Sequence, residues 1–324
     1  MCEGLYQFKV SIVIVCMNNL KNLCYCLNSI RKYTHEVSYE TLVVAYLFSK
    51  ENLEKAKVDF PWVTFIESNE IRGFSENNNL ALHQATGKYC FVLNDDTEMK
   101  MPVIDKLVET IECLPEDVAV VSPRSVYGDG TFQSCGRPIH NIYTFVLSCF
   151  HLYSEKRYLK KVKFANGTFE TGDIVGAFFL INTDVFRQIG FFDERFFFTP
   201  EDIAIGYELR KKRWKHYVNS DVEIIHYEGM SGGRTVSKIR EPTAPAGTRG
   251  NLIFYSHGNN IVYVVIAFLK AFSLLPNCVF HFFKGLLFQS PNIYQIYAVC
   301  DWHSFLACFS RKTPREVFLK YYKR

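Results

Sequence analysis

The stretch Tyr89-Cys90-Phe91-Val92-Leu93-Asn94-Asp95-Asp96-Thr97 begins as an apolar run and ends in two adjacent acids. A short apolar run bounded by turn-forming residues is typical of a buried strand. In open α/β sheets, ligands bind outside the carboxyl ends of the strands. We therefore expect Asp95 and Asp96 at the ligand-binding edge of a sheet, where a carboxylate can hold a divalent cation against a diphosphate.

A second acidic pair, Glu201-Asp202, opens a helical pattern that runs to the basic residues 210–213. Thr199-Pro200 before it is favourable chemistry for a helix start, and basic residues suit the last turn. These acids therefore have a structural explanation as well as a functional one. Together the two clusters indicate an enzyme acting on a nucleotide sugar, with one cluster holding a metal and the other supplying a base.

The segments around the first cluster alternate between strand and helix patterns. We expect strands at 10–15, 41–45 and 62–66, and helices at 20–30, 75–86 (ended by Gly87) and 103–111. Further on we expect strands at 173–181 and 222–226, with a short helix ending at Gly190, whereas 125–163 shows no clear pattern. This order predicts an α/β fold with a mostly parallel central sheet, flanked by helices through right-handed crossovers.

The composition of the chain argues against several classes of protein. A chain of 324 residues can form one large domain and an appendage, and its net charge of +4 gives no indication of a nucleic-acid partner. Of the 11 cysteines only Cys24 and Cys26 are close, which argues against a thiolate metal site and favours a reducing, cytosolic compartment. Residues 1–9 lack the long apolar core of a signal peptide.

The last quarter of the chain is apolar and basic. Residues 242–300 contain no Asp or Glu, and a basic tail follows them. Because Lys270, Pro276 and Lys284 interrupt the apolar run, we expect two short helices broken at Pro276 rather than a membrane crossing. We expect a first domain over 1–245 and a helical segment over 246–324 that rests on anionic membrane. The alternative is a helical cap packed on the first domain, with a solvated tail.

Seven motifs in order resemble those of the family 2 glycosyltransferases with the GT-A fold, especially the rhamnosyl- and galactosyltransferase-like members. The resemblance covers roughly residues 8–260. The motifs are Val10–Asn19, Asn69–Asn79, Asn94–Thr97 at the place of the metal-binding D-x-D-like motif, Gly176-Ala177, Gly190–Phe197, Glu201-Asp202 and Ile225–Ser231.

The resemblance implies an inverting, divalent-metal-dependent transfer of a sugar from a nucleoside-diphosphate donor to a glycan acceptor. A lipid-linked acceptor, surface polysaccharide synthesis and a peripheral position at the inner face of the cell membrane are implied with it. Asp96 and His226 would be the metal ligands, Asp202 the base, and Glu201 an alternative base or an orienting residue. The implied donor-binding residues are Asn18, Arg72, Gly73, Asn77, Asp95, Asp96 and Gly176, and Asp173 would touch the acceptor.

The chemistry explains why these residue types are needed. A divalent cation neutralises the charge that builds on a leaving diphosphate. Oxygen ligands suit Mg²⁺ or Mn²⁺, and an imidazole ligand is tolerated better by Mn²⁺. Inversion requires a base for the proton of the acceptor hydroxyl. Amides of the Gly73-Phe74 turn could face phosphate, and Gly176-Ala177 leaves room for a sugar ring. Turn geometry alone also explains these glycines, and a lone histidine is more often structural.

At three positions this sequence departs from the family pattern, and these differences leave other functions open. Ala45 stands where the family carries an aspartate that contacts the nucleobase, so base recognition must be weaker or rest on the backbone and Tyr46. Met17 replaces a tyrosine, and Ala204 replaces an acid often present there. The alternative function is therefore a catalytically impaired partner that binds sugar nucleotides or glycans. A nucleotidyltransferase is disfavoured because no Gly-rich basic loop follows the first strand.

Overall fold

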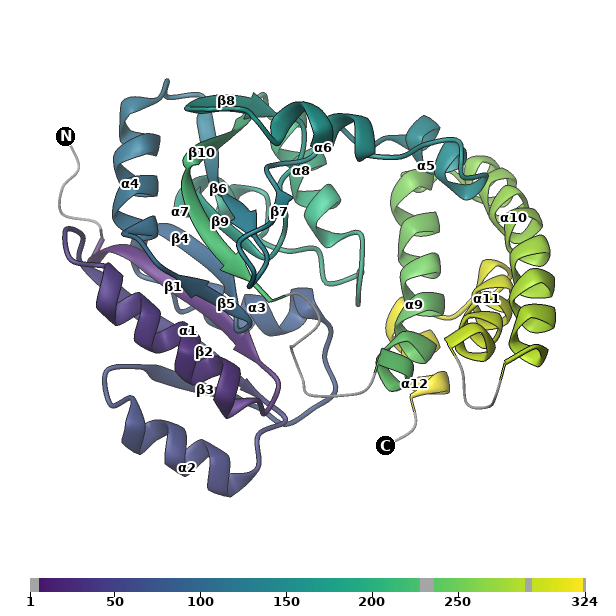
Figure 1. Ribbon diagram of the computed structural model, residues 1–324, viewed down its shortest axis with the longest axis horizontal. Coiled ribbons are helices and arrows are strands. Elements are labelled where there is room, and N and C mark those ends of the chain that lie inside the picture. Colours follow the sequence, from purple (N-terminus) through teal and green to yellow (C-terminus); the bar gives the residue numbers. More distant parts are fainter. Residues whose placement is uncertain (1–5, 228–235, 289–292, 323–324) are drawn as a thin grey trace. The chain divides into compact units, whose positions relative to one another are not determined.

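The computed structural model describes residues 6–227, 236–288 and 293–322 (Figure 1). The chain divides into two compact units. The sheet unit comprises Met1–Ile139, Glu155–Asp193 and Asp202–Gly233, and the helical unit comprises His140–Ser154, Glu194–Glu201 and Arg234–Arg324.

The sheet unit is built on one mixed sheet whose strands are mostly parallel, as the sequence predicts. Its first half contains β3 (Thr64–Ser68), β2 (Tyr39–Tyr46), β1 (Phe8–Cys16) and β4 (Gly87–Asn94), all parallel and in that order. Next comes β9 (Phe178–Asn182), antiparallel to both β4 and β6 (Val118–Val126). Then follow β10 (Lys215–His226), parallel to β6, and β5 (Thr97–Met99), antiparallel to β10. Two short strands lie off this path, β7 (Phe132–Ser134) on β6 and β8 (Thr168–Thr171) on β10.

Helices cover both faces of this sheet (Figure 1). Side chains alternate along a strand, so Ile12 and Ile14 of β1 pack in one apolar cluster and Val13 in another. The first cluster includes α1 (Leu20–Tyr33) and α4 (Val103–Cys113), and the second includes α3 (Phe74–Leu82), α7 (Thr183–Gln188) and α8 (Glu201–Lys211). Two further helices are α2 (Lys50–Asp59) and α6 (Lys156–Val162). The carboxyl ends of β4 and β10 are thereby held on a packed scaffold.

Some expected boundaries are wrong. The helix expected to reach residue 86 ends at Leu82, and Gly87 begins β4. A Cβ at residue 87 would lie 2.5 Å from the Ser11 backbone nitrogen, so this glycine permits close strand contact and does not end a helix. The strand expected at 173–181 begins only at Phe178. The prediction that α7 ends near Gly190 is confirmed, since Gly190 has φ +85°.

The helical unit contains α5 (Ile142–Cys149), α9 (Val236–Ser256), α10 (Asn260–Leu286), α11 (Ile293–Cys308) and α12 (Pro314–Tyr321). Helix α9 packs with α10, α11 and α12, and α10 packs with α11. The expected break at Pro276 is wrong, because α10 is one helix of 27 residues with Pro276 inside it. By length and composition α10 could cross a membrane. The boundary expected after residue 245 falls inside α9.

Candidate active site

The first acidic pair lies just beyond β4, in a turn fixed by backbone hydrogen bonds. The Asn94 N–H donates to the Ala177 carbonyl oxygen at 2.8 Å, and the Tyr227 N–H donates to the Asp96 carbonyl oxygen at 2.9 Å. The Thr97 hydroxyl donates to the Asn94 carbonyl oxygen at 2.8 Å. Asp95 and Asp96 are both buried. The turn is therefore anchored to the segment before β9 and to the end of β10.

Asp96 and His226 face each other. The Nε2 atom of His226 lies 3.4 Å from the Oδ1 atom of Asp96, because His226 ends β10 opposite Thr97 in the sheet register. The other ring nitrogen, Nδ1, lies 3.2 Å from the side-chain oxygen of Gln133. An amide oxygen accepts the Nδ1 proton and leaves Nε2 as a ligand atom turned toward Asp96.

A carboxylate oxygen and an imidazole nitrogen in this arrangement fit a divalent cation. In the part of the chain that the structure describes, no group of three or more His, Cys, Asp or Glu side chains could hold a metal ion. Further ligands would have to come from elsewhere, as with cations that are bound partly through substrate phosphates.

Two thiols lie close to these acids, and no sequence motif marked them. Burial raises the pKa of Cys16 well above its usual value, and the nearby Asp95 carboxylate adds to the effect. Burial also raises the pKa of Cys26, with smaller contributions from Asp95 and Asp96. Both conditions favour the neutral thiol beside the acidic pair.

Asp202 is held by two hydrogen bonds at the start of α8. Its Oδ1 accepts the Ile203 N–H at 2.8 Å, and its Oδ2 accepts from Nη1 of Arg137 at 2.7 Å. The other Arg137 terminal nitrogen, Nη2, donates to Glu155 at 3.1 Å. Burial works to lower the pKa of Arg137, but Asp202, Glu155 and Asp173 outweigh it and raise that pKa. Arg137 is thus a permanent cation shared by several carboxylates.

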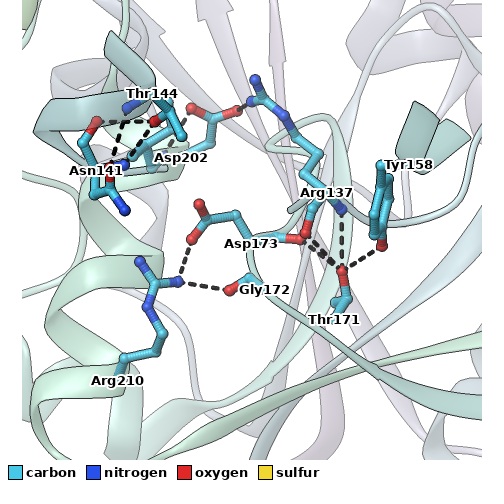
Figure 2. A network of polar contacts seen from close by, with 10 residues as sticks. Arg137, Asn141, Thr144, Tyr158, Thr171, Gly172, Asp173, Asp202 and Arg210 are labelled. Atoms are coloured by element: carbon cyan, nitrogen blue, oxygen red, sulfur yellow. Dashed lines mark hydrogen bonds and ion pairs between the residues drawn. The ribbon is translucent and has the colours of Figure 1, made fainter. Parts of the chain in front are cut away.

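Asp173 lies next to this network, in the interior of the sheet unit. Its side chain is fully buried and forms an ion pair with Arg210 (Figure 2). Its backbone pairs with that of Arg137 through two hydrogen bonds of 2.9 Å. In this position Asp173 supports the backbone of Arg137. Its expected contact with an acceptor stays a prediction.

Gly176 joins the two acidic clusters. A Cβ built at residue 176 would lie 3.1 Å from the Cβ of Asp202, while the next residue, Ala177, accepts the Asn94 N–H. The Asp95-Asp96 turn and Asp202 are therefore separated by the width of one backbone segment. Asp202 and the first acidic pair therefore lie at the same edge of the sheet.

The residues expected to bind the donor are mostly engaged in shaping turns. Asn18 accepts hydrogen bonds from the Ser49 N–H and the Asn52 side chain, at 3.0 and 2.9 Å. The Gly73 N–H donates to Glu76 at 2.9 Å, so the amide expected to face phosphate already has an acceptor. Asn77 is buried, accepts from the Ser68 hydroxyl at 2.7 Å and donates to the Gly73 carbonyl oxygen at 3.1 Å.

Arg72 is partly exposed, and its guanidinium donates to Ser68 and Glu70 at 3.1 and 3.0 Å. Glu201 is the first residue of α8. Ala45 is buried at the end of β2, next to Tyr46, whose hydroxyl accepts the Arg72 N–H at 3.3 Å. Residues 228–231 of the last motif lie outside the described residues.

Sequence comparison identifies an O-antigen biosynthesis protein and a rhamnosyltransferase as relatives. The chain is 27% identical over 155 residues to the O-antigen biosynthesis protein RfbC of Myxococcus xanthus, covering 48% of this chain and 12% of that protein. It is 35% identical over 63 residues to the N-acetylglucosaminyl-diphospho-decaprenol L-rhamnosyltransferase of Mycobacterium tuberculosis, covering 19% of this chain and 20% of that protein. The matches thus span small parts of these relatives.

Structure comparison identifies two similar folds. The crystal structure of GalNAc-T7 with UDP, GalNAc and Mn²⁺ superposes with a TM-score of 0.54 at 17% identity, covering 74% of this chain and 48% of that one. The mannosyltransferase PcManGT from Pyrobaculum calidifontis, in complex with GDP-Man and Mn²⁺, gives a TM-score of 0.52 at 14% identity, covering 94% and 86%. At such identities these similarities show the fold alone, which is GT-A.

The family model described as glycosyl transferase family 2 matches residues 11–190, more than half of the chain. The matched range contains the first acidic pair, Gly176-Ala177 and the first half of the sheet except the first three residues of β1. With its GT-A fold and its order of motifs, this chain belongs to glycosyl transferase family 2.

Proposed function

We propose that the chain is an inverting, divalent-metal-dependent glycosyltransferase that moves a sugar from a nucleoside-diphosphate donor to a glycan acceptor. The observation that carries this proposal is the junction at Gly176-Ala177. It brings a pair of metal-type ligands, Asp96 and His226, to the same sheet edge as the hydrogen-bonded carboxylate of Asp202.

Asp96 and His226 would hold Mn²⁺ or Mg²⁺, and the imidazole favours Mn²⁺. When bound, the cation supplies a positive charge for the departing diphosphate. Both similar structures were solved with Mn²⁺, which supports this choice of ion. Asp95 would face the ribose side of the donor, together with Arg72.

Asp202 would act as the base. The acceptor oxygen forms its bond to the anomeric carbon while the bond from that carbon to the diphosphate oxygen breaks. The diphosphate leaves with the electron pair, and the acceptor proton moves to Oδ2 of Asp202. Arg137 orients this carboxylate through its 2.7 Å hydrogen bond and keeps a second partner in Glu155 when Asp202 becomes neutral. Arg137 is thus a positioning residue, and Glu201 would orient a substrate.

The acceptor is proposed to be lipid-linked, in surface polysaccharide synthesis at the cytoplasmic face of the membrane. One relative is named for a decaprenol-linked substrate. An exposed apolar face on α10 supports membrane contact. It consists of Ile261, Val265, Phe268, Phe272, Leu275, Val279, Phe282 and Leu286, spaced alternately four and three residues apart. The opposite side of α10 is buried at Ile266, Ala267, Ala271 and Leu274, which favours a helix lying in the interface over one that crosses it.

A transfer and donor-hydrolysis assay over a panel of nucleotide sugars, with Mn²⁺ or Mg²⁺, tests the proposal. Turnover should require the cation, Asp96→Ala should abolish it, and the product should have the anomeric configuration opposite to that of the donor. Full activity in excess chelator would contradict the metal assignment.

Asp202→Asn should lower kcat by about 10²–10⁴-fold, as expected for loss of a general base, while donor affinity measured by calorimetry stays unchanged. Asp59→Asn, at an exposed acid at the end of α2, is the matched control. If Asp202→Asn weakens donor binding but turns over normally at saturation, Asp202 is a binding residue.

The second candidate, an impaired sugar-nucleotide or glycan-binding partner, is favoured by the buried Ala45 at the expected nucleobase position. A methyl group cannot accept a hydrogen bond from a base, so discrimination between nucleoside diphosphates should be loose. Donor binding without turnover of any donor, with or without cation, would select this candidate.

A further inference from the structure

The helical unit contains a cavity of about 420 Å³ that no motif and no proposed catalytic residue uses. Its lining comes from α9, α10 and the end of α11, and includes Arg249, Tyr263, Phe268, Phe309 and Arg311. This volume lies in the range of about 300–1,000 Å³ that is usual for small-molecule sites.

One wall of the cavity continues the exposed apolar face of α10. Phe268 belongs to that face and is 60% exposed, and Phe309 at the end of α11 is 51% exposed. Their rings contact each other edge to face, with centroids 5.4 Å apart. An apolar chain lying along α10 would therefore run directly to the mouth of the cavity.

The other wall carries positive charge that lacks a counter-ion. Arg249 is partly buried, and no carboxylate in residues 6–227, 236–288 and 293–322 neutralises it. Burial accordingly lowers the pKa of Arg249. Its Nε donates to the Lys312 carbonyl oxygen at 2.8 Å, and Nη1 contacts the Tyr263 hydroxyl. A guanidinium has five N–H donors. The contacts with Lys312 and Tyr263 therefore use only some of the donors of Arg249.

The two acids nearest to Arg311 in the sequence are already engaged. Asp301 accepts from His281 at 2.7 Å, and Glu316 accepts from the Thr313 N–H at 2.8 Å in the first turn of α12. Arg311 adds a second, exposed guanidinium to the cavity. Burying part of a cation without a counter-ion is costly, and two guanidinium groups are suited to bidentate binding of phosphate oxygens.

We propose that this cavity binds the phosphate group of an anionic membrane lipid, with Arg249 and Arg311 on the phosphate and Phe268 and Phe309 against the lipid chain. The inference rests on the proposed membrane contact and is independent of the transfer chemistry. It adds a specific headgroup site to what would otherwise be diffuse attraction between a basic protein and a charged surface.

Vesicle co-sedimentation of the full chain tests this site. The vesicles contain phosphatidylcholine alone or with phosphatidic acid, and the variants are Arg311→Gln, Arg249→Lys and the control Arg315→Gln, which removes the same charge outside the cavity. Arg311→Gln should weaken binding to the anionic vesicles roughly tenfold or more, as for a lost charged hydrogen bond. Arg315→Gln should weaken it by no more than about fivefold, the effect of one surface charge.

Arg249→Lys keeps the positive charge but loses the planar guanidinium, so it should also weaken binding to the anionic vesicles. Its melting temperature shows whether the chain stays folded. Equal losses in Arg311→Gln and Arg315→Gln would overturn the proposal in favour of diffuse attraction. Equal binding to both kinds of vesicle would overturn it as well.

Binding of inorganic phosphate distinguishes a site for a lipid phosphate from a site for a soluble anion. If millimolar phosphate binds the protein without vesicles, and Arg311→Gln abolishes this binding, the site is for a soluble anion and the lipid assignment fails. Donor hydrolysis should be the same in wild type and Arg311→Gln. A chain that fails to hydrolyse any donor but keeps the vesicle difference would therefore refute the proposed function and leave the lipid site standing.

Discussion

Gly176 and Asp202 contact each other although they belong to different motifs. A Cβ at residue 176 would lie 3.1 Å from the Asp202 Cβ, closer than side chains usually approach. Gly176→Ala should therefore displace the proposed base by a few tenths of an ångström and lower kcat by up to about 10²-fold, since small misplacements of reacting groups are expensive. Steady-state kinetics measures this, with the melting temperature as a control for folding. Unchanged kcat would show that the carboxylate position at 202 is not critical.

His216 gives the stability of the protein a defined pH dependence. Burial lowers the pKa of His216 to about 4, and Arg210 acts in the same direction while Asp173 opposes it. The unfolded chain binds a proton near pH 6.5 and the folded chain does not. The stability that the neutral His216 contributes is therefore fully present above pH 6.5. This contribution is lost as the pH falls toward 4.

This loss should reach about 2 kcal/mol between pH 7.5 and 5. Urea unfolding at the two pH values should show it in the wild type and show less in His216→Leu, which has no titrating group there. Identical pH slopes in the two proteins would refute the assignment to this histidine.

Motif order and spacing predicted Asp96, His226 and Asp202, and the structure brings these residues to one edge of the sheet. Their roles stay predictions. Arg137 could not be predicted, because it lies in a stretch without periodicity and its position depends on backbone pairing with a residue far along the chain. The ion pair of Asp173 with Arg210 could not be predicted either, because a sequence does not show whether a carboxylate faces solvent or a buried arginine.

At the scale of elements, Asn79 of α3 holds the loop after α7. Its side chain donates to the Phe192 carbonyl oxygen at 2.9 Å and accepts the Phe192 N–H at 3.1 Å, and all of these groups are buried. Asn79→Ala would leave both backbone groups without this partner, so unfolding should become easier by about 2–4 kcal/mol. Chemical denaturation measures the change.

Asn182→Ala is a useful comparison for that variant. Asn182 caps the more exposed start of α7 through the Asp184 and Val185 N–H groups, and losing such a cap costs about 1 kcal/mol. Asn79→Ala should be the more destabilising of the two. The reverse order would mean that the loop after α7 does not depend on Asn79.

Helices and strands with regularly spaced apolar residues could be predicted from the sequence, whereas others could not. The strands β1, β2 and β4 and the helices α1 and α4 each carry a continuous buried side. Helix α2 was missed because only Leu53 and Ala56 are buried in a mostly charged segment. The break expected at Pro276 failed because one missing N–H removes a single hydrogen bond, while packing of the buried side of α10 continues past it.

At the scale of the whole chain, the helical unit is assembled from three separate stretches. The sequence indicated only the last of them, because the apolar, acid-free composition begins at residue 242. Within this unit Phe145 stacks on Tyr255 at 4.5 Å, and Phe197 packs on Phe318 at 4.4 Å. Early and late segments therefore share one core.

A chain truncated after Pro245 should consequently be unstable. The cut falls inside α9 and exposes the aromatic rings of both early stretches, so we expect aggregation on size-exclusion chromatography and a lower melting temperature. A chain ending at Tyr321, which keeps α9 to α12, is the control. A monomeric truncated protein with cooperative unfolding at the original temperature would instead establish residues 1–245 as an independent domain.

The place of β9 in the sheet has a consequence for synthesis on the ribosome. Among the described strands, β9 alone pairs with both β4 and β6, yet β4 is complete at residue 94 and β9 does not begin until residue 178. During translation the edge of β4 stays open, and β6, which runs in the same direction as β4, is made first. Direct pairing of β4 with β6 would shut out β9. Such a nascent chain would also lose Gly176-Ala177 from its place beside Asn94, so the position of both acidic clusters depends on β4 remaining unpaired at this edge until β9 is made.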